Sequence, residues 1–274
     1  MAHRATRSEI LTTLQRARAT RSLVAAGVGM GLSAGAAAQA GADLIVAYHS
    51  APLRLRGLPS VSGALPVADA NHDTLAILPE VVRCAADRPV IATVFASDPR
   101  LAFDAHLARL ASLGAAGVMN APPITLLEPA LRCDLDSAGL GFERELELTS
   151  RARERGLLTV MYAFDAAQAA DLIGAGVDVL VLHLGITRPG RDAAPTAELV
   201  AFTAALDAHP EIVYLVHGGP ISTPQDVSRI QDEHPRVDGF FGVSSIERLP
   251  ITAAVSRAVQ AFAYDRNPGG RHED

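Results

Sequence analysis

Residues 176–183 read Gly-Val-Asp-Val-Leu-Val-Leu-His, and this stretch decides the fold. A glycine that can end a helix is followed by a run of β-branched and leucine residues, which predicts a helix end and then a buried strand. The same order recurs as Gly-Ala-Asp-Leu-Ile-Val at 41–46 and as Gly-Ala-Ala-Gly-Val at 114–118. Repetition of one helix–strand unit indicates a parallel sheet, because each parallel strand needs a crossover that returns the chain to the same edge.

Eight runs of this type can be placed along the chain, and each is followed by a stretch rich in Ala and Leu that suits a helix. The runs cover residues 23–28, 43–48, 89–95, 117–119, 157–162, 177–184, 212–216 and 239–243. The chain has 274 residues, close to the roughly 250 of one closed barrel, and no Ser/Gly-rich or Pro-rich linker divides it. We therefore predict a single α/β domain, a (β/α)8 TIM barrel.

Helices are expected between these strands, together with an extra leading helix within residues 1–22 and a polar tail at 265–274. The pairs Asp98-Pro99 and Thr223-Pro224 suit the N-cap and first positions of two helices. Two long excursions, 49–69 and 120–141, are expected to cover the barrel mouth. The leading helix is expected at 8–19. The other segments that favour a helix are 33–40, 71–86, 142–155, 165–174 and 251–263, and the last of these is expected to close the ring of helices around the barrel.

Composition excludes several classes of function. The net charge of −6 offers no basic stripe to follow a phosphate backbone, so nucleic acid is not expected as a partner. The sequence contains no lysine, which excludes Schiff-base chemistry because that route needs an ε-amine. No apolar run reaches the about 18 residues of a membrane span without a glycine, so no membrane partner is expected.

Two features bear on the compartment of the protein. Cys84 and Cys133 form no C-x-x-C pair, which indicates free thiols in a reducing environment. Residues 23–38 are apolar, follow a basic region and end like a signal-peptide cleavage site, so a secreted protein is an alternative. Glu9 within the basic region and the glycines of the apolar run favour an unprocessed, cytoplasmic chain.

Candidate catalytic residues follow from barrel geometry, because chemistry gathers at the carboxyl ends of the strands. His183 and His217 end the sixth and seventh strands, so their imidazoles are expected to share a pocket as acid, base or metal ligand. Glu145 and Asp98 are the carboxylates expected to orient a histidine or to hold a divalent metal. No compact motif such as His-Glu-x-x-His occurs, so metal dependence stays open.

The same rim offers candidates for substrate binding. Gly218 and Gly219 follow the seventh strand and Ser244 and Ser245 the eighth, where barrels commonly bind phosphate or carboxylate with backbone N–H groups. Tight turns are the alternative role for these pairs. Arg248 lies just beyond and could clamp an anion, with a structural ion pair as the alternative. The remaining candidates at strand ends are Gly29, Tyr48, His49, Asn120 and Tyr162.

Several blocks are distinctive beyond this general pattern. They include His-Gly-Gly-Pro-Ile at 217–221, Gly-Val-Ser-Ser-Ile-Glu-Arg-Leu-Pro at 242–250, and Gly-Leu-Gly-Phe at 139–142 followed by Glu145. In these blocks the sequence resembles the phosphoenolpyruvate hydrolase-like family of TIM barrels, also known as phosphonopyruvate hydrolase-like proteins, over about residues 24–262. The resemblance implies a barrel that acts on a small α-keto or enol acid, with or without a phosphate group.

The chain also departs from the family pattern. After Tyr48 the family usually has Asn, where this chain has His49, and of the Gly-Arg-Tyr-Arg that follows only Arg54 is kept. The lysine-containing lid and the acidic cluster that hold magnesium and substrate in mutase-type barrels are not found in this sequence. Substrate identity therefore does not follow from the resemblance.

The expected function is that of a hydrolase or lyase, in which His183 or His217 moves the proton of an enolate. The alternatives are a carbon–carbon lyase or isomerase of specialised metabolism, and a ligand-binding or interaction barrel without turnover. A small anionic substrate is the expected partner, and a divalent metal is an open possibility. The leading helix and an Ala-rich exterior also predict a homo-oligomer.

Overall fold

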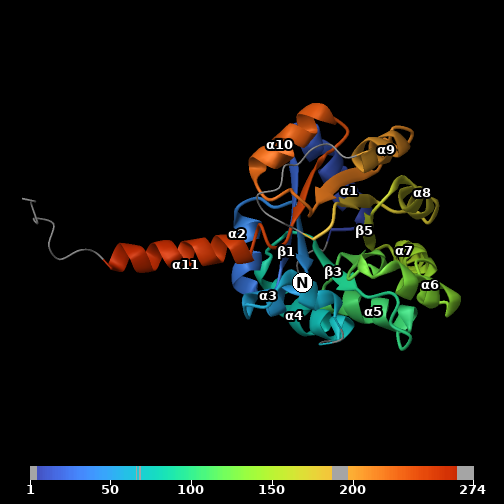
Figure 1. The fold of residues 1–274 in the computed structure, drawn as a ribbon, viewed down its shortest axis with the longest axis horizontal. Coiled ribbons are helices and arrows are strands. Elements are labelled where there is room, and N and C mark those ends of the chain that lie inside the picture. The colour runs from blue at the N-terminus through green and yellow to red at the C-terminus, as the bar shows by residue number, and fades with distance from the viewer. Residues whose placement is uncertain (1–4, 66, 68, 187–196, 264–274) are drawn as a thin grey trace, which may run out of the picture.

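The computed structural model describes residues 5–65, 67, 69–186 and 197–263, and its centre is a closed barrel of eight parallel strands (Figure 1). Each strand pairs with the next in the chain, and β8 pairs with β1 to close the ring. The TIM barrel predicted from the sequence is confirmed. The strands are β1 Leu23–Val28, β2 Leu44–Ala47, β3 Val90–Val94, β4 Gly117–Asn120, β5 Leu158–Ala163, β6 Val179–His183, β7 Val213–His217 and β8 Gly239–Gly242.

One main helix follows each of the strands β1 to β7 and packs around the barrel (Figure 1). Within the described ranges, no helix has the length and apolar character needed to cross a bilayer. For α9, after the sixth strand, the sequence predicted a helix without giving its bounds. The main helices that follow these strands are α2 Gly31–Gln39, α4 Ala70–Cys84, α5 Phe103–Leu113, α7 Glu143–Glu154, α8 Ala166–Gly174, α9 Ala197–Leu206 and α10 Pro224–Glu233.

Side chains of each strand alternate between two apolar layers. Leu44 and Val46 of β2 point into the barrel and join its inner cluster, whereas Ile45 and Ala47 join the layer between strands and helices. This alternation follows from the twofold period of a strand. Because both faces of the sheet are buried, the strands are continuous apolar runs, and for this reason the sequence predicts them.

The helix α1 (Arg7–Arg18) closes the amino-terminal end of the barrel. Its side chains Ile10 and Leu14 are buried and pack into the inner cluster. A capping box between Thr6 and Glu9 fixes the start of the helix. The interior is therefore closed at this end, and a ligand reaches it from the opposite end.

Three aspartates, of which Asp43 and Asp178 are buried and Asp238 is partly buried, reinforce the same end. Asp43, Asp178 and Asp238 directly precede β2, β6 and β8, and each accepts a hydrogen bond from a backbone N–H of the preceding strand. Arginines pair with all three, and two of these arginines come from α1. The pairs are Arg21 with Asp43, Arg7 and, at 4.0 Å, Arg153 with Asp178, and Arg18 and Arg236 with Asp238.

The connections after β2, β3 and β4 differ from expectation. Asp98 does not begin a helix, because its carboxylate accepts from the backbone N and Nε of Arg100, both at 2.9 Å, and α5 begins only at Phe103. The two long excursions are partly helical. They contain α3 Ala51–Leu55 and 3-10 turn η1 Ser60–Ala64 in the first, and 3-10 turn η2 Ile124–Leu126 and α6 Pro129–Ser137 in the second.

The last helix does not close the ring, so this prediction was wrong. The helix α11 (Arg248–Phe262) has no buried residue and projects away from the barrel (Figure 1). The outer surface where a closing helix would pack is correspondingly open. Val24 of β1 and Phe240 of β8 are partners in the strand register, and they are the two residues of the eight strands that are not buried. The expected tail at 265–274 lies outside the described residues.

Candidate active site

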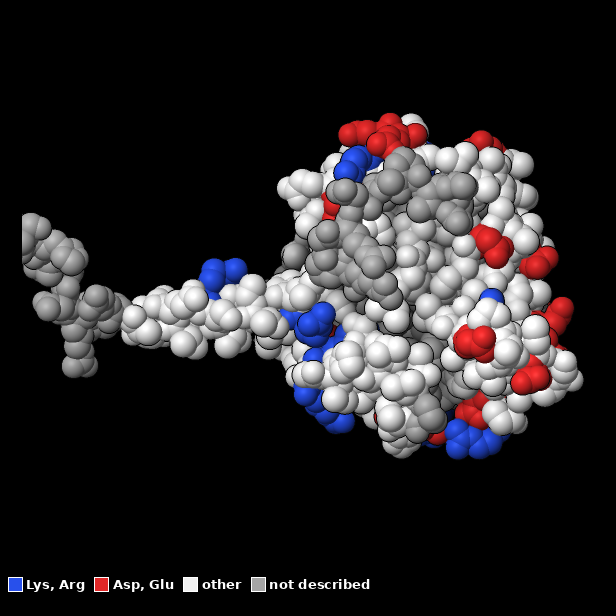
Figure 2. All heavy atoms as spheres, viewed as in Figure 1, with Lys and Arg blue, Asp and Glu red and all other residues white. Residues whose placement is uncertain are grey.

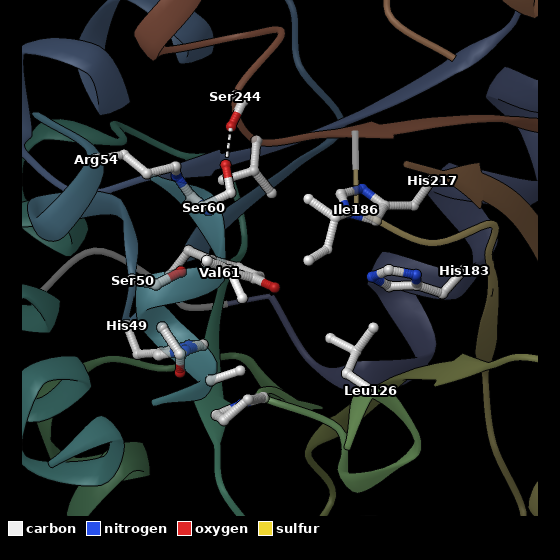
Figure 3. Close-up of a pocket in the computed structure, with 15 residues that line it drawn as sticks. His49, Ser50, Arg54, Ser60, Val61, Leu126, His183, Ile186, His217 and Ser244 are labelled. Atoms are coloured by element: carbon white, nitrogen blue, oxygen red, sulfur yellow. Dashed lines mark hydrogen bonds between the residues drawn. The ribbon is translucent and has the colours of Figure 1, made fainter. Parts of the chain in front are cut away.

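A small cavity of about 80 Å³ lies at the carboxyl ends of the strands, the rim where the sequence placed the chemistry (Figure 3). Its walls come from the ends of β2, β6 and β7, from the loop after β8, and from the excursion that carries α3 and η1. Val61, Leu126 and Ile186 supply apolar surface. Its polar lining consists of Tyr48, His49, Ser50, Arg54, Ser60, His183, His217 and Ser244.

The structure brings His183 and His217 together in this cavity. They are register partners at the ends of β6 and β7, and their ring centroids are 4.9 Å apart. Both residues are buried, with 5% and 7% of their surface exposed, and the ring of Tyr162 packs against each. Two imidazoles therefore face one small space, as the adjacent strand ends predicted.

The hydrogen bonds of the two rings set opposite tautomers. His217 Nδ1 lies 2.7 Å from the carbonyl oxygen of Phe241, which can only accept, so Nδ1 carries the hydrogen and Nε2 has a free lone pair. His183 Nδ1 accepts from the backbone N–H of Gly185 at 3.0 Å, so its hydrogen is on Nε2. One ring can therefore accept a proton while its neighbour donates a hydrogen bond.

Burial keeps both rings neutral. Desolvation lowers the pKa of His217 to about 4, partly offset by its bond to Phe241 and lowered further by Arg54. Desolvation, followed by repulsion from His217, holds the pKa of His183 well below the ordinary value. Near neutral pH the pair is therefore an acceptor and a donor without formal charge.

Arg54 is the most unusual residue of the cavity. Its side chain is buried, and its guanidinium lies 5.2 Å from the centroid of the Tyr48 ring. Within the described residues no carboxylate lies within ion-pair distance of Arg54, and Nη2 has no hydrogen-bond partner. Burial lowers the pKa of Arg54, and attraction to the buried Glu247, beyond ion-pair distance, only partly opposes this. Since burying an unpaired charge is costly, an anion in the cavity would relieve this penalty.

Arg54 was not among the site residues chosen from the sequence. In the sequence it stands out only as the residue kept from the family pattern after Tyr48. The signal that could have selected it is its place in a long excursion at the barrel mouth, on a short apolar helix that has to pack inward. Ala51 and Leu53 of the same helix are buried, which holds Arg54 beneath the surface.

Tyr48 and His49 also line the cavity, as expected. The hydroxyl of Tyr48 lies 3.3 Å from that of Tyr162, which is fully buried behind it. His49 Nε2 donates to the carbonyl oxygen of Gly63 at 3.2 Å, and desolvation lowers the pKa of its ring to about 3. His49 therefore fastens η1 over the cavity.

Glu145 and Asn120 lie close to the cavity but do not line it. Glu145 accepts from the side chain of Asn120 and from the backbone N–H of Ile124, and burial raises its pKa to about 7. Asn120 in turn accepts from the backbone N–H of Tyr162 at 2.6 Å. These bonds tie β4, β5 and η2 together, so both residues position the walls of the site.

Other expected binding residues are engaged elsewhere. The N–H of Gly219 donates to the carbonyl oxygen of Gly185 at 2.8 Å, and both glycines after β7 have positive φ, so this pair forms a tight turn. The N–H of Gly29 donates to Glu247 at 2.9 Å. Ser245 and Arg248 do not line the cavity, whereas Ser244 does, with its hydroxyl 3.2 Å from that of Ser60 (Figure 3).

The described residues do not fit a divalent metal at this site. They contain no group of three or more His, Cys, Asp or Glu that could hold an ion. Both carboxylates expected as metal ligands already accept hydrogen bonds from other side chains. Asp98 accepts from Arg100, and Glu145 accepts from Asn120. The positive charge in the cavity comes instead from Arg54.

Comparison with known proteins places the chain in a family. A family model described as phosphoenolpyruvate hydrolase-like matches residues 9–264. The chain belongs to the phosphoenolpyruvate hydrolase-like family. The ToMV resistance protein Tm-1 of Solanum lycopersicum is 37% identical over 249 residues, which are 88% of this chain and 33% of that protein. The chain thus spans a third of the length of this relative, and the family resemblance seen in the sequence is confirmed.

Solved structures extend the comparison to more distant barrels. A phosphonopyruvate hydrolase in complex with oxalate and Mg²⁺ matches with a TM-score of 0.63 at 14% identity, over 98% of this chain and 92% of that chain. An oxaloacetate acetylhydrolase matches with a TM-score of 0.64 at 15% identity, over 95% and 88%. A 2,3-dimethylmalate lyase of the PEP mutase/isocitrate lyase superfamily matches with a TM-score of 0.62 at 16% identity, over 96% and 92%. At these identities the likeness establishes a shared fold.

Proposed function

We propose that this protein is a hydrolase or lyase that acts on a small α-keto or enol acid through an enolate. One observation carries the proposal: a buried guanidinium, with no carboxylate of the described residues within ion-pair distance, shares a small cavity with two imidazoles of opposite tautomer. Membership of the phosphoenolpyruvate hydrolase-like family supports the same class of substrate. Fold neighbours that are hydrolases and lyases of small acids add support.

In this proposal Arg54 binds the carboxylate or phosphate of the substrate, because a guanidinium offers two parallel N–H donors to such groups. The hydroxyls of Ser60 and Ser244 add donors at the same side of the cavity. This arrangement replaces the backbone cradle expected at Gly218 and Gly219. A bound anion also neutralises Arg54, which removes one cause of the low pKa of His217.

His217 Nε2 then acts as the base and His183 Nε2–H as the donor. For carbon–carbon cleavage, His217 takes the proton of a substrate hydroxyl, whose carbon becomes a carbonyl as the adjacent bond breaks. The electron pair of that bond passes to the keto-acid fragment as an enolate, whose oxygen is stabilised by His183 and Arg54. The proton on His217 returns to the enolate carbon, so the site ends in its starting state.

The test is a comparison of binding and turnover between the wild type and Arg54→Met. Binding of oxalate, pyruvate and oxaloacetate is measured by calorimetry. Consumption of oxaloacetate, phosphoenolpyruvate and 4-hydroxy-2-oxopentanoate, which carries the hydroxyl that the cleavage step needs, is measured by NMR. We expect oxalate to bind the wild type at least about 30-fold more tightly than the variant, since a charged hydrogen-bonded pair is lost. Equal affinity of the two proteins would overturn the anion site, and binding of all acids without consumption would overturn the enzyme.

The same titrations include arms with EDTA and with added Mg²⁺. Because the described residues offer a guanidinium and no carboxylate cluster, we expect oxalate affinity to change by less than about twofold between the arms. A large gain with Mg²⁺ would show that a cation, and not Arg54 alone, binds the anion.

We propose further that the protein is a homo-oligomer held together by α11. Ile251, Val255, Val259 and Phe262 recur every three or four residues, so they form one apolar stripe along this helix, and Phe262 is 87% exposed. The helix is almost free of charged side chains (Figure 2). A second copy would cover this stripe with its open β1–β8 surface, around Val24 and Phe240.

Light scattering coupled to gel filtration tests this assembly. Val255→Asp places a charge in the apolar stripe and is expected to give a monomer. Gln260→Asp adds the same charge on the opposite face of α11 and should leave the oligomer intact. A wild type that is monomeric at all concentrations, or two variants that behave alike, would contradict the assembly.

A further inference from the structure

A second, larger cavity of about 470 Å³ lies beside the mouth cavity. It is bounded by the residues after η1, by the end of β3 and by the segment of η2 and α6, and most of its wall is apolar. The charged residues at its edge bind one another, since Arg100 pairs with both Asp69 and Asp98. These pairs leave no free charge to recognise a polar ligand. Its apolar wall includes Leu65, Phe95, Pro122, Pro123, Ile124, Leu127, Leu131 and Leu135.

The helix α6 presents its apolar stripe to this cavity and not to the core. Leu131 and Leu135, four residues apart on α6, both line the cavity, as does Leu127 just before the helix, while α6 has no buried residue. Leu131 is 47% exposed and Leu65, across the cavity, is 48% exposed. The free energy falls when a hydrocarbon group covers such exposed apolar surface.

The two cavities meet at a wall made of small or rigid residues. Gly63, Ala64 and Pro122 line both of them. Gly63 is fixed by its carbonyl, which accepts from His49, and Pro122 has no N–H that would lose a water partner on contact with an apolar group. An acid bound beside Arg54 is therefore separated from the apolar surface of the second cavity only by these shared lining residues.

We infer that the second cavity takes the hydrocarbon tail of the substrate, so that the preferred ligand is a keto acid with an alkyl chain of several carbons. The inference rests on the proposed function, because the acid head group has to occupy the mouth cavity beside Arg54. The occupant is defined by surface and position: the cavity is mostly apolar, its charged residues pair with one another, and it adjoins the anion site at Gly63, Ala64 and Pro122. A small dicarboxylate would leave it unused.

The experiment is a chain-length series bound to the full protein by calorimetry: pyruvate, 2-oxobutanoate, 2-oxohexanoate and 2-oxooctanoate. We expect affinity to rise by about fourfold for each added methylene that enters the cavity, the factor that corresponds to burial of one such group. Oxalate serves as the head-group reference that does not reach the second cavity. Affinities that are flat along the series would overturn the inference.

Two matched variants separate this inference from the proposed function. Leu131→Glu places a carboxylate at the exposed edge of the second cavity, and Leu58→Glu makes the same change at a residue that is 43% exposed and lines neither cavity. We expect Leu131→Glu to abolish the gain with chain length and to leave oxalate affinity unchanged, and Leu58→Glu to change neither. If oxalate binds and length gives no gain, only the tail site is wrong; if no acid binds at all, the proposed function fails as well.

Discussion

At the amino-terminal end of the barrel the buried Asp43 and Asp178 and the partly buried Asp238 have arginine partners, whereas at the carboxyl-terminal end Arg54 is buried with no carboxylate of the described residues within ion-pair distance. Both ends belong to the same eight strands and have similar burial. They differ in whether each charge and each hydrogen-bonding group is satisfied by the chain itself. In a TIM barrel, conserved polar groups at the first end serve stability and those at the second serve chemistry.

The same contrast holds for the uncharged groups. At the amino-terminal end Asp178 accepts from the backbone and side chain of Thr159 as well as from Arg7, so its oxygens are fully used. At the mouth, the Nε2 atoms of His183 and His217 have no hydrogen-bond partner in the described part of the chain. Unsatisfied groups that face a cavity are therefore the ones available to a ligand.

The largest expected effect comes from removing an ion pair at the amino-terminal end of the barrel. Asp178→Asn removes the charge that binds Arg7 and is expected to destabilise the protein by about 3 kcal/mol, because it leaves a partly buried guanidinium unpaired. In a thermal melt this corresponds to a fall in Tm of about 10 °C for a domain of this size. Turnover per folded molecule should be unchanged, and a variant with normal Tm and reduced turnover would reverse the assignment of the two ends.

The next largest effect is expected at the carboxyl-terminal end, where groups that face the cavity lack partners. His217→Gln keeps a side chain of similar size and is expected to lower turnover at least about 100-fold, since it removes the proposed base. Its Tm should stay within a few degrees of the wild type, because the ring contributes one hydrogen bond, to Phe241. Steady-state kinetics and a thermal melt of the same preparation check both values. Retention of wild-type turnover would exclude His217 from the chemistry.

The dependence of stability on pH sharpens the comparison. The pKa of His217 is about 4 in the folded chain and about 6.5 when unfolded, so its contribution to stability is present above pH 6.5 and is lost as pH falls towards 4. Glu145 acts in the opposite sense, because its folded pKa of about 7 exceeds its unfolded value; stability rises as pH falls from about 7. The pH dependence of the free energy of unfolding of the wild type therefore reflects only the difference between the contributions of His217 and Glu145.

Urea denaturation of variants separates these contributions. Between about pH 7 and about pH 5 the wild type is expected to lose about 1–2 kcal/mol more stability than His217→Gln. Glu145→Gln should lose more stability than the wild type over the same interval, because it removes the compensating proton uptake. Identical changes in all three proteins would show that neither group is buried as the structure places it.

The architecture was largely predictable from the sequence, for a physical reason. Strands buried on both faces give continuous apolar runs, and glycines that end helices mark their starts, as at Gly176. The arrangement of α11 was not predictable, because its sequence favours a helix and does not state what the helix packs against. The start of α5 was missed because Asp98 bonds to Arg100 instead of capping a helix.

The candidate site was predictable where it depends on strand ends. His183, His217, Tyr48 and His49 all reach the cavity because parallel strands end at one rim. Arg54 could not be selected in this way, since its position depends on how α3 folds back over the barrel. The availability of backbone donors was also hidden in the sequence, because it depends on bonds such as that from Gly219 to Gly185.

The smallest expected effect isolates burial from pairing. Asp104 forms ion pairs with Arg151 and Arg155 on the outside of the barrel. These are carboxylate–guanidinium pairs like those at the amino-terminal end, but the side chain of Asp104 is 59% exposed. Asp104→Asn is expected to shift Tm by less than about 2 °C, because water and salt screen an exposed pair and replace its hydrogen bonds. Comparison with Asp178→Asn in low and high salt then gives the contribution of burial alone. If the two variants were equally destabilised, the special character of the amino-terminal end would be lost, and pairing rather than burial would account for the stability of this barrel.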